Sequence, residues 1–464
     1  MDFFYDEEKD KDYEKIESHY LSNTISYGLE KKKNGEIVFY DSNGELESPA
    51  SQEESKKDFT KIDFDRVISE KIRKIVYGEK YSNIVFLAGA GASVTHDLNP
   101  NYGKTVKMIA DDVFLKLHEA NELYTLEELA RQCMYKNGNI LDEEELGESD
   151  TPRLYSGFNL EDFLSTLFHY RPFVPDTDKE KFNNSIKKIL QLIKENTNYS
   201  YDSKELKHGK LLNFLSSLSG KDGNKFSVIT TNYDVLIEEA AATNNFVIFD
   251  GFNFTPIPKF DSSMFEWNLV KEVQNINTRE VEYKDKTFNL LKIHGSLTWE
   301  KQDDGTILRK DKDSITDTDK MVMVFPSSDK YAQSYQEPYF ELFTKFQDLI
   351  KRPNTLLISS GFSFSDVHIS KMVTQALKNN TSLKLLVTNF DIDPNREYIE
   401  AERKFKLIDE ADSKYNQNWA ELIDLMDEGY PITFLKATMN SDLVDFLKGK
   451  YLNDKDWYFL WSSW

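Results

Sequence analysis

The sequence contains a single cysteine, Cys133, among 464 residues. One cysteine excludes an intramolecular disulfide and also a zinc site built from four cysteines. No run of 18 or more apolar residues is present, so we expect no membrane span. Residues 1–15 are acidic and lack the basic-then-apolar pattern of a secretory signal. These absences predict a cytoplasmic protein that does not depend on a metal.

Basic residues are the minority among the charged ones. Lys and Arg number 58 and Asp and Glu number 80, which leaves a net charge of −22. A surface that binds duplex nucleic acid needs positive charge to neutralise phosphates, so direct binding of nucleic acid is disfavoured, although a local basic patch is compatible with this composition. Hydrophobic residues, at 39%, supply ample material for a core. The length suits two ordinary domains or one large domain with insertions.

Residues 1–75 differ from the rest and predict a small β appendage. Apolar and polar residues alternate over 25–29, a turn follows at 33–35, and 37–40 is again apolar, which is the pattern of a β-hairpin. The charged residues 52–58 are typical of a linker. The appendage could serve docking or oligomerisation, or it could pack on its own subunit.

From residue 76 to 464, apolar runs alternate with amphipathic helical patterns, which predicts an α/β fold with a Rossmann-like parallel sheet and helices on both faces. Between about 120 and 222 only amphipathic segments recur, so we expect a large helical insertion there, covering a ligand cleft. The predicted strands span residues 84–88, 226–230, 246–249, 290–293, 321–325, 356–359, 383–387 and 431–435.

Small or polar residues follow five of these predicted strands. They are Gly89 to Ser93, Asn232, His294, Gly361 to Ser363, and Asn389. Ligands of open α/β sheets bind at the carboxyl ends of the strands, so five such ends together predict a site. The first, Gly89-Ala90-Gly91-Ala92-Ser93, is a strand-to-helix turn whose small residues let a phosphate approach the backbone. Taken alone, this turn could equally be small for packing reasons.

In their order and content these strand ends resemble the motifs of the sirtuins. The chain has GAGAS at 89–93, TTNYD at 230–234, HGS at 294–296, GFS at 361–363 and Asn389. Two further segments, SSGFSFSDVHI at 359–369 and NLEDFLSTL at 159–167, resemble the sirtuin-like domains of bacterial antiphage defence proteins. The resemblance spans about residues 80–390.

The resemblance implies an NAD site and a role for each matching residue. Asn232 and His294 would be catalytic, with the amide orienting ribose and water and the imidazole acting as a base. Asp234 could hold the ribose or the Asn232 loop, or only cap the next helix; Asp366 is expected to cap its helix. Contacts to NAD are implied for Gly89, Ala90, Gly91, Ser93, Thr231, Asp234, Gly361, Ser363 and Asn389.

The chain also departs from the protein deacylases of this family. The deacylase loop after the first motif is replaced by VTHDLNPNYG at 94–103, Thr231 stands where a glutamine is usual, and the four zinc cysteines are absent. We therefore expect an NAD+ glycohydrolase that depletes NAD+ in antiphage defence. The alternatives are a non-catalytic sensor of NAD or ADP-ribose and an NAD-dependent deacylase.

The resemblance further implies a homo-oligomer and a protein partner, for example a HerA-like ATPase or an Argonaute-like protein. The tail at 457–464, WYFLWSSW, is strongly apolar. Such a tail either folds back onto its own subunit or docks on a partner.

Overall fold

The structure is a computed structural model of the 464-residue chain. It describes residues 13–32, 36–46, 59–120, 122–141, 153–155, 157–219, 223–273, 280–323, 337–399, 404–408 and 415–451. The turn at 33–35, the linker at 52–58 and the tail at 457–464 lie outside the described residues. No described helix is both long and apolar enough to cross a membrane.

The chain divides into two compact units, each made of separate stretches of sequence. The first contains Met1–Leu87, Lys210–Phe226 and Gln347–Trp464, and the second contains Ala88–Gly209 and Ser227–Phe346. The domain boundary placed near residue 75 stays a prediction.

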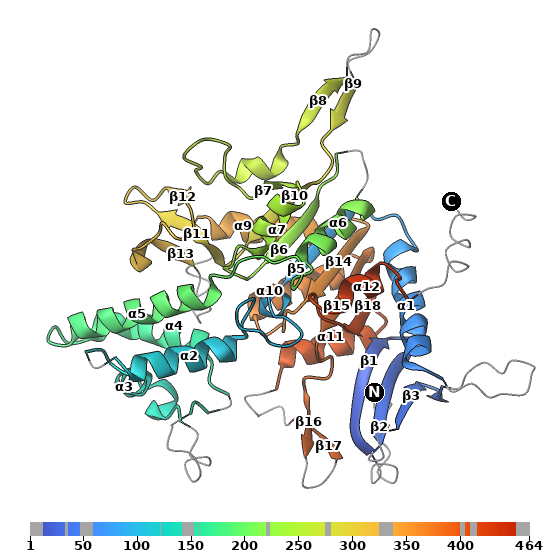
Figure 1. Cartoon of the computed structure of the whole chain (residues 1–464), viewed down its shortest axis with the longest axis horizontal. Coiled ribbons are helices and arrows are strands. Elements are labelled where there is room, and N and C mark those ends of the chain that lie inside the picture. The colour runs from blue at the N-terminus through green and yellow to red at the C-terminus, as the bar shows by residue number, and fades with distance from the viewer. Residues whose placement is uncertain are drawn as a thin grey trace, which may run out of the picture. The chain divides into compact units, whose positions relative to one another are not determined.

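The α/β fold expected from the sequence is confirmed. Eleven of the described strands form one mixed sheet, in the order β4-β3-β2-β1-β18-β15-β14-β5-β6-β10-β7, and helices flank it (Figure 1). Its strands are β1 (Tyr13–Ser22), β2 (Ser26–Lys32), β3 (Ile37–Asp41), β4 (Gly44–Glu45), β5 (Asn83–Ala88), β6 (Phe226–Thr230), β7 (Val247–Phe249), β10 (Thr287–Lys292), β14 (Thr355–Ser360), β15 (Leu383–Asn389) and β18 (Ile432–Lys436).

The N-terminal hairpin is confirmed, and its strands continue the main sheet, which is therefore mixed. Strand β2 pairs with β3, and β1 pairs antiparallel with β18 through Tyr20 and Leu435. By contrast, β14 and β15 are parallel, as are β15 and β18. Strands joined by short turns must run antiparallel, and β1 therefore brings an antiparallel ribbon to a parallel core.

Helices of the first unit pack in ways that their sequences explain. Helix α1 (Lys61–Tyr77) begins with a capping box between Thr60 and Asp63, and Phe64, Ile68 and Ile72 lie on one fully buried stripe. The remaining helices that lie wholly or partly in this unit are α6 (His208–Leu218), α9 (Tyr339–Lys351), α10 (Val367–Asn379), α11 (Gln417–Asp427) and α12 (Leu443–Leu447). Strand β16 (Arg396–Ile399) pairs antiparallel with β17 (Lys404–Leu407).

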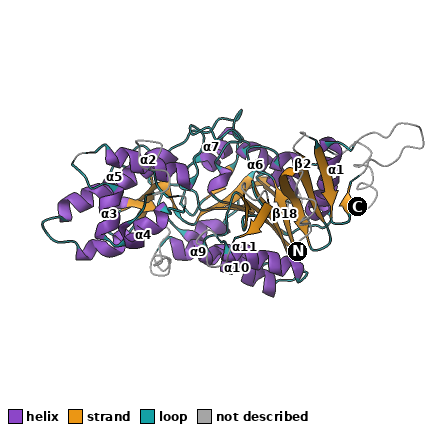
Figure 2. Ribbon diagram, turned by 90° about the horizontal axis from the view of Figure 1, so that it is seen from below, coloured by secondary structure: helices purple, strands orange, loops and turns teal. Residues whose placement is uncertain are grey.

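Helices of the second unit gather between residues 106 and 197, whereas the last segment of the predicted insertion, at 206–218, is α6 and lies mostly in the first unit. The helices between 106 and 197 share one hydrophobic core, in which Val113, Leu129, Phe163 and Ile189 are fully buried. Figures 1 and 2 show these helices gathered in one group. They are α2 (Val106–His118), α3 (Leu126–Gln132), α4 (Leu160–Tyr170) and α5 (Lys179–Thr197). Short 3-10 helices span Ala90–Ala92, Tyr135–Gly138, Arg171–Phe173, Ser262–Glu266 and Thr318–Lys320.

The second unit also contains two small antiparallel elements that the sequence did not reveal. A three-stranded sheet has the order β12-β11-β13, and β8 pairs antiparallel with β9. The predicted strand at 321–325 belongs to this small sheet over its described part, not to the parallel one. These strands are β8 (Val270–Val273), β9 (Glu280–Tyr283), β11 (Gly295–Lys301), β12 (Ile307–Arg309) and β13 (Met321–Met323); helix α7 (Leu236–Thr243) follows β6.

Candidate NAD site

The loop after β6 is tied directly to the end of β5. The backbone N–H of Thr231 donates to the carbonyl oxygen of Ala88 at 3.2 Å, and the Thr230 hydroxyl donates to the same oxygen at 3.1 Å. The motif at 230–234 therefore lies beside the turn at 89–93, although the two are about 140 residues apart in sequence.

Asn232 reaches into this turn with its side-chain amide. Its Nδ2 donates to the carbonyl oxygen of Gly89 at 3.0 Å and to the hydroxyl of Ser93 at 2.8 Å. A carbonyl oxygen can only accept a hydrogen bond, which fixes which end of the amide faces the turn. Both Nδ2 hydrogens are used, so Oδ1 is the end of this partly exposed side chain that can meet a ligand.

Ser93 and Asp234 complete the network. The Ser93 hydroxyl donates to Oδ2 of Asp234 at 2.7 Å, while Oδ1 of Asp234 accepts from the backbone N–H of Leu236 at 3.1 Å. Both side chains are buried. Asp234 thus binds both the Ser93 hydroxyl and the first residue of α7, a helix whose N-cap is Val235.

Within the turn, Gly89 is buried but Ala90 and Gly91 are exposed, and Ala92 and Ser93 are buried again. A single 3-10 turn shapes the backbone, with the N–H of Ala92 donating to Gly89 and that of Ser93 donating to Ala90. The exposed backbone of Ala90 and Gly91 is therefore the part that a pyrophosphate could approach.

The loop that replaces the deacylase sequence folds back onto this turn. A Cβ placed on Gly103 would lie 2.0 Å from the carbonyl oxygen of Ser93, so only glycine fits there. The next residue is anchored as well, because the backbone N–H of Lys104 donates to the hydroxyl of Tyr199 at 2.9 Å.

His294 lies in the tight turn that joins β10 to β11. Its neighbours bind the Asn232 loop, since Ile293 N–H donates to Thr230 at 3.0 Å and Leu297 N–H donates to Tyr233 at 3.1 Å. His294 itself is 5% exposed. Gly295 has φ of +88°, and a Cβ there would meet the Val322 carbonyl oxygen at 2.0 Å, which explains the glycine after the histidine.

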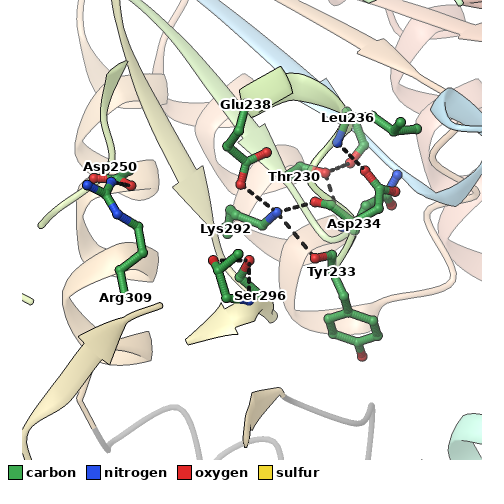
Figure 3. A network of polar contacts seen from close by, with 12 residues as sticks. Thr230, Tyr233, Asp234, Leu236, Glu238, Asp250, Lys292, Ser296 and Arg309 are labelled. Carbon is green, nitrogen blue, oxygen red and sulfur yellow. Dashed lines mark hydrogen bonds and ion pairs between the residues drawn. The ribbon is translucent and has the colours of Figure 1, made fainter. Parts of the chain in front are cut away.

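Lys292 was missed by the sequence reasoning. Its Nζ donates to the carbonyl oxygens of Tyr233 (3.4 Å) and Asp234 and pairs with Oε1 of Glu238 at 2.9 Å (Figure 3). Burial raises the pKa of Glu238, and Lys292 opposes that rise. The available signal was a lysine inside the apolar strand run Leu290-Leu291-Lys292-Ile293.

Three further predicted site residues lie in the first unit, at adjacent strand ends. The backbone N–H of Gly361 donates to Thr388 at 3.1 Å, which places Gly361 beside Asn389. The Ser363 hydroxyl pairs with that of Ser365 at 2.8 Å. Asp366 caps α10 as predicted, accepting from the backbone N–H groups of His368 and Ile369.

No group of three or more metal-binding side chains is found among the described residues. The turn at 89–93, the loop at 230–234 and His294 supply backbone groups, hydroxyls, an amide, a carboxylate and an imidazole.

One family model matches part of the chain. Residues 227–408 match a family model described as a SIR2-like domain, and the chain therefore contains a sirtuin-like domain. The matched residues include Asn232, His294 and Asn389, whereas the turn at 89–93 precedes them. Kinship with the antiphage defence branch in particular stays a prediction.

Two other comparisons add little. No curated protein matches the sequence. A solved structure of cytosolic 5'-nucleotidase IIIB bound to cytidine is similar over 85% of this chain and 92% of its own, at 10% identity. Its TM-score of 0.25 is too low to support any statement about this protein.

Proposed function

We propose that the protein is an NAD+ glycohydrolase, which cleaves NAD+ to nicotinamide and ADP-ribose. The proposal is supported by the SIR2-like domain, since such domains use NAD. It is supported further by the meeting of the turn at 89–93, the loop at 230–234 and the turn at 293–295 within one unit.

The fixed orientation of Asn232 carries the proposal. Because Gly89 and Ser93 occupy both amide hydrogens, Oδ1 is presented as an acceptor. In the proposed reaction the bond between ribose C1′ and the nicotinamide nitrogen breaks, and its electron pair leaves with neutral nicotinamide. Positive charge develops on the ribose, and an amide oxygen can orient a ribose hydroxyl or the attacking water beside it.

His294 is proposed as the base. Water that attacks C1′ must lose one proton, and an imidazole can accept it near neutral pH. The hydrogen bonds from Ile293 to Thr230 and from Leu297 to Tyr233 hold the histidine turn against the Asn232 loop. His294 would thereby activate the water, and Asn232, on the neighbouring loop, would orient the ribose.

The test is release of free nicotinamide from NAD+ by purified protein, alone and with the product of a neighbouring gene. We expect release by the wild type, and a loss on the order of 10² to 10⁴ in His294→Ala and Asn232→Ala. His118→Ala, at an exposed histidine on α2, is the control and should keep wild-type activity. Activity that survives both site substitutions would refute this site.

The two alternative functions give different outcomes in the same experiment. Binding of ADP-ribose with no nicotinamide release under any condition would indicate a sensor. Formation of O-acetyl-ADP-ribose from an acetyl-lysine peptide would indicate a deacylase. The missing deacylase loop at 94–103 and the missing zinc cysteines favour hydrolysis.

A role in antiphage defence is part of the proposal. We propose that the protein acts as a homo-oligomer in the cytoplasm and that a partner, such as a HerA-like ATPase or an Argonaute-like protein, controls NAD+ depletion. Co-purification with the products of neighbouring genes, followed by the nicotinamide assay, tests this control.

A further inference from the structure

We propose that Lys292 is a positioning residue whose ammonium group fixes the loop that carries Asn232, an inference that rests on the proposed NAD+ hydrolysis. Lys292 precedes His294 by two residues and its side chain reaches the loop of Asn232. It thereby connects the two segments that carry the proposed chemistry.

The location of Lys292 is unusual for a lysine. The residue is 1% exposed, and its strand neighbours Leu290, Leu291 and Ile293 are fully buried. Removing an ammonium group from water is expensive unless hydrogen bonds and an opposite charge compensate. A methionine or leucine would fill an apolar strand position without a desolvation penalty, so core packing alone does not explain a lysine here.

All three acceptors of Lys292 lie in one short segment after β6. They are the carbonyl oxygens of Tyr233 (3.4 Å) and Asp234, and Oε1 of Glu238 (2.9 Å) (Figure 3). An ammonium group has three hydrogens, so three acceptors account for its full donor capacity. Both residues precede α7, and the Tyr233 carbonyl oxygen also accepts from the backbone N–H of Leu297 at 3.1 Å.

The same segment determines the direction of the Asn232 amide. Asp234, whose carbonyl oxygen binds Lys292, accepts the Ser93 hydroxyl with its carboxylate, and Ser93 in turn accepts from Asn232. A rotation of the backbone at Tyr233 or Asp234 would therefore move the Asp234 carboxylate and disturb the Asn232 amide. Lys292 restrains that rotation from the side of β10.

Lys312, a second lysine that contacts helix α7, provides a matched control. Lys312 donates to the carbonyl oxygen of Tyr199 at 2.8 Å and pairs with Oε1 of Glu239 at 3.0 Å. Glu239 follows Glu238 directly in α7. Both lysines thus join a backbone carbonyl to a glutamate of α7, but the acceptors of Lys312 lie outside the loop at 231–235.

The experiment compares Lys292→Met with Lys312→Met in the full chain. Nicotinamide release gives kcat and KM for NAD+, and thermal unfolding gives Tm. For Lys292→Met we expect kcat to fall about 100-fold, the effect of a misplacement near 1 Å. KM should stay within about threefold, because the substrate contacts remain. Lys312→Met should keep kcat within about twofold of wild type.

A double variant separates positioning from folding. Lys292→Met leaves the Glu238 carboxylate, which is 25% exposed, without its cation, so Lys292→Met/Glu238→Leu should regain Tm. Because the ammonium donor to Tyr233 and Asp234 is still missing, kcat should remain low, although the backbone N–H of Leu297 still donates to Tyr233. Recovery of kcat together with Tm would overturn the proposal, as would an equal loss of kcat in Lys312→Met.

The outcomes also separate this inference from the proposed function. No nicotinamide release by the wild type, alone or with its partner, would reject NAD+ hydrolysis and the positioning role with it. Normal release by the wild type and by Lys292→Met would reject the positioning role alone.

Discussion

The hydroxyl oxygen of Ser93 lies 2.8 Å from Nδ2 of Asn232 and accepts its hydrogen, although 139 residues separate the two in sequence. The same hydroxyl donates to Asp234 at 2.7 Å. Ser93 therefore acts as a bridge between a carboxylate and the amide proposed to meet the ribose. The Ser93 hydroxyl hydrogen therefore points at the Asp234 carboxylate, whereas the motif implies a contact between Ser93 and NAD.

Replacing Ser93 with alanine should remove this bridge. Asp234 then loses a donor and Asn232 an acceptor, which should lower the free energy of unfolding by about 1–3 kcal/mol. We expect kcat for nicotinamide release to fall at least about tenfold, since the amide is no longer held. Chemical denaturation and steady-state kinetics measure the two effects.

Ser185 is the matched control for that substitution. It is fully buried, donates to Lys181 at 2.8 Å and accepts from the backbone of Tyr124 at 2.8 Å, within the helical insertion. Ser185→Ala should have a similar effect on stability and leave kcat unchanged. If both variants lose kcat in proportion to stability, Ser93 has no particular role in the site.

Asn232→Asp should inactivate the site while keeping its size. A carboxylate cannot donate to the carbonyl oxygen of Gly89, so the side chain must turn away from the contact at 3.0 Å. We expect kcat to fall on the order of 10² to 10³. Calorimetry with ADP-ribose should still detect binding, because the turn at 89–93, which is proposed to meet the phosphates, is intact. Loss of binding would instead give Asn232 a role in affinity.

Gly295→Ala should be far more harmful than Gly305→Ala. Both glycines have a positive φ, +88° and +85°, so alanine is strained at each by about 1–2 kcal/mol. Only Gly295 adds a clash, with the Val322 carbonyl oxygen at 2.0 Å, whereas a Cβ on Gly305 meets open space. Thermal unfolding and nicotinamide release should show a mild effect for Gly305 and loss of activity for Gly295.

Stability should depend on pH through His208. Burial lowers the pKa of His208 to about 4, and the nearby Asp234 carboxylate opposes that shift. Between pH 6.5 and 4, His208 binds a proton in the unfolded chain but stays neutral in the folded protein. The contribution of His208 to the free energy of unfolding is therefore fully present above pH 6.5 and is lost as the pH falls towards 4. For a pKa shift of this size, the free energy of unfolding falls by up to about 3 kcal/mol.

The variant His208→Phe isolates this contribution, since a phenyl ring can keep the edge-on contact with Tyr201. Urea denaturation at several pH values between 7 and 4.5 should show a weaker pH dependence for the variant than for the wild type. If the free energy of unfolding depended on pH equally in the two proteins, a buried neutral His208 would be excluded.

Much of the fold is visible in the sequence because buried strands and amphipathic helices have distinct periodicities. The apolar run before Gly89 predicts β5, and the segments at 120–222 predict helices. The N-terminal ribbon was not assigned to the main sheet, since its pairing with β18 joins residues more than 400 apart. The three-stranded sheet after His294 was missed for a related reason, since its strands are short and two of them have three residues.

The sequence by itself predicted which residues follow the strands, because the buried strands are apolar runs. The order of these residues along the chain resembles that of the sirtuin motifs. Only the tertiary structure decided what each polar atom does. Hydrogen-bond partners depend on how strands far apart in sequence are placed, so the bridge from Asp234 through Ser93 to Asn232 has no local signature. Lys292 illustrates the same point, since a lysine in an apolar run gains meaning only from the carbonyl oxygens that it meets.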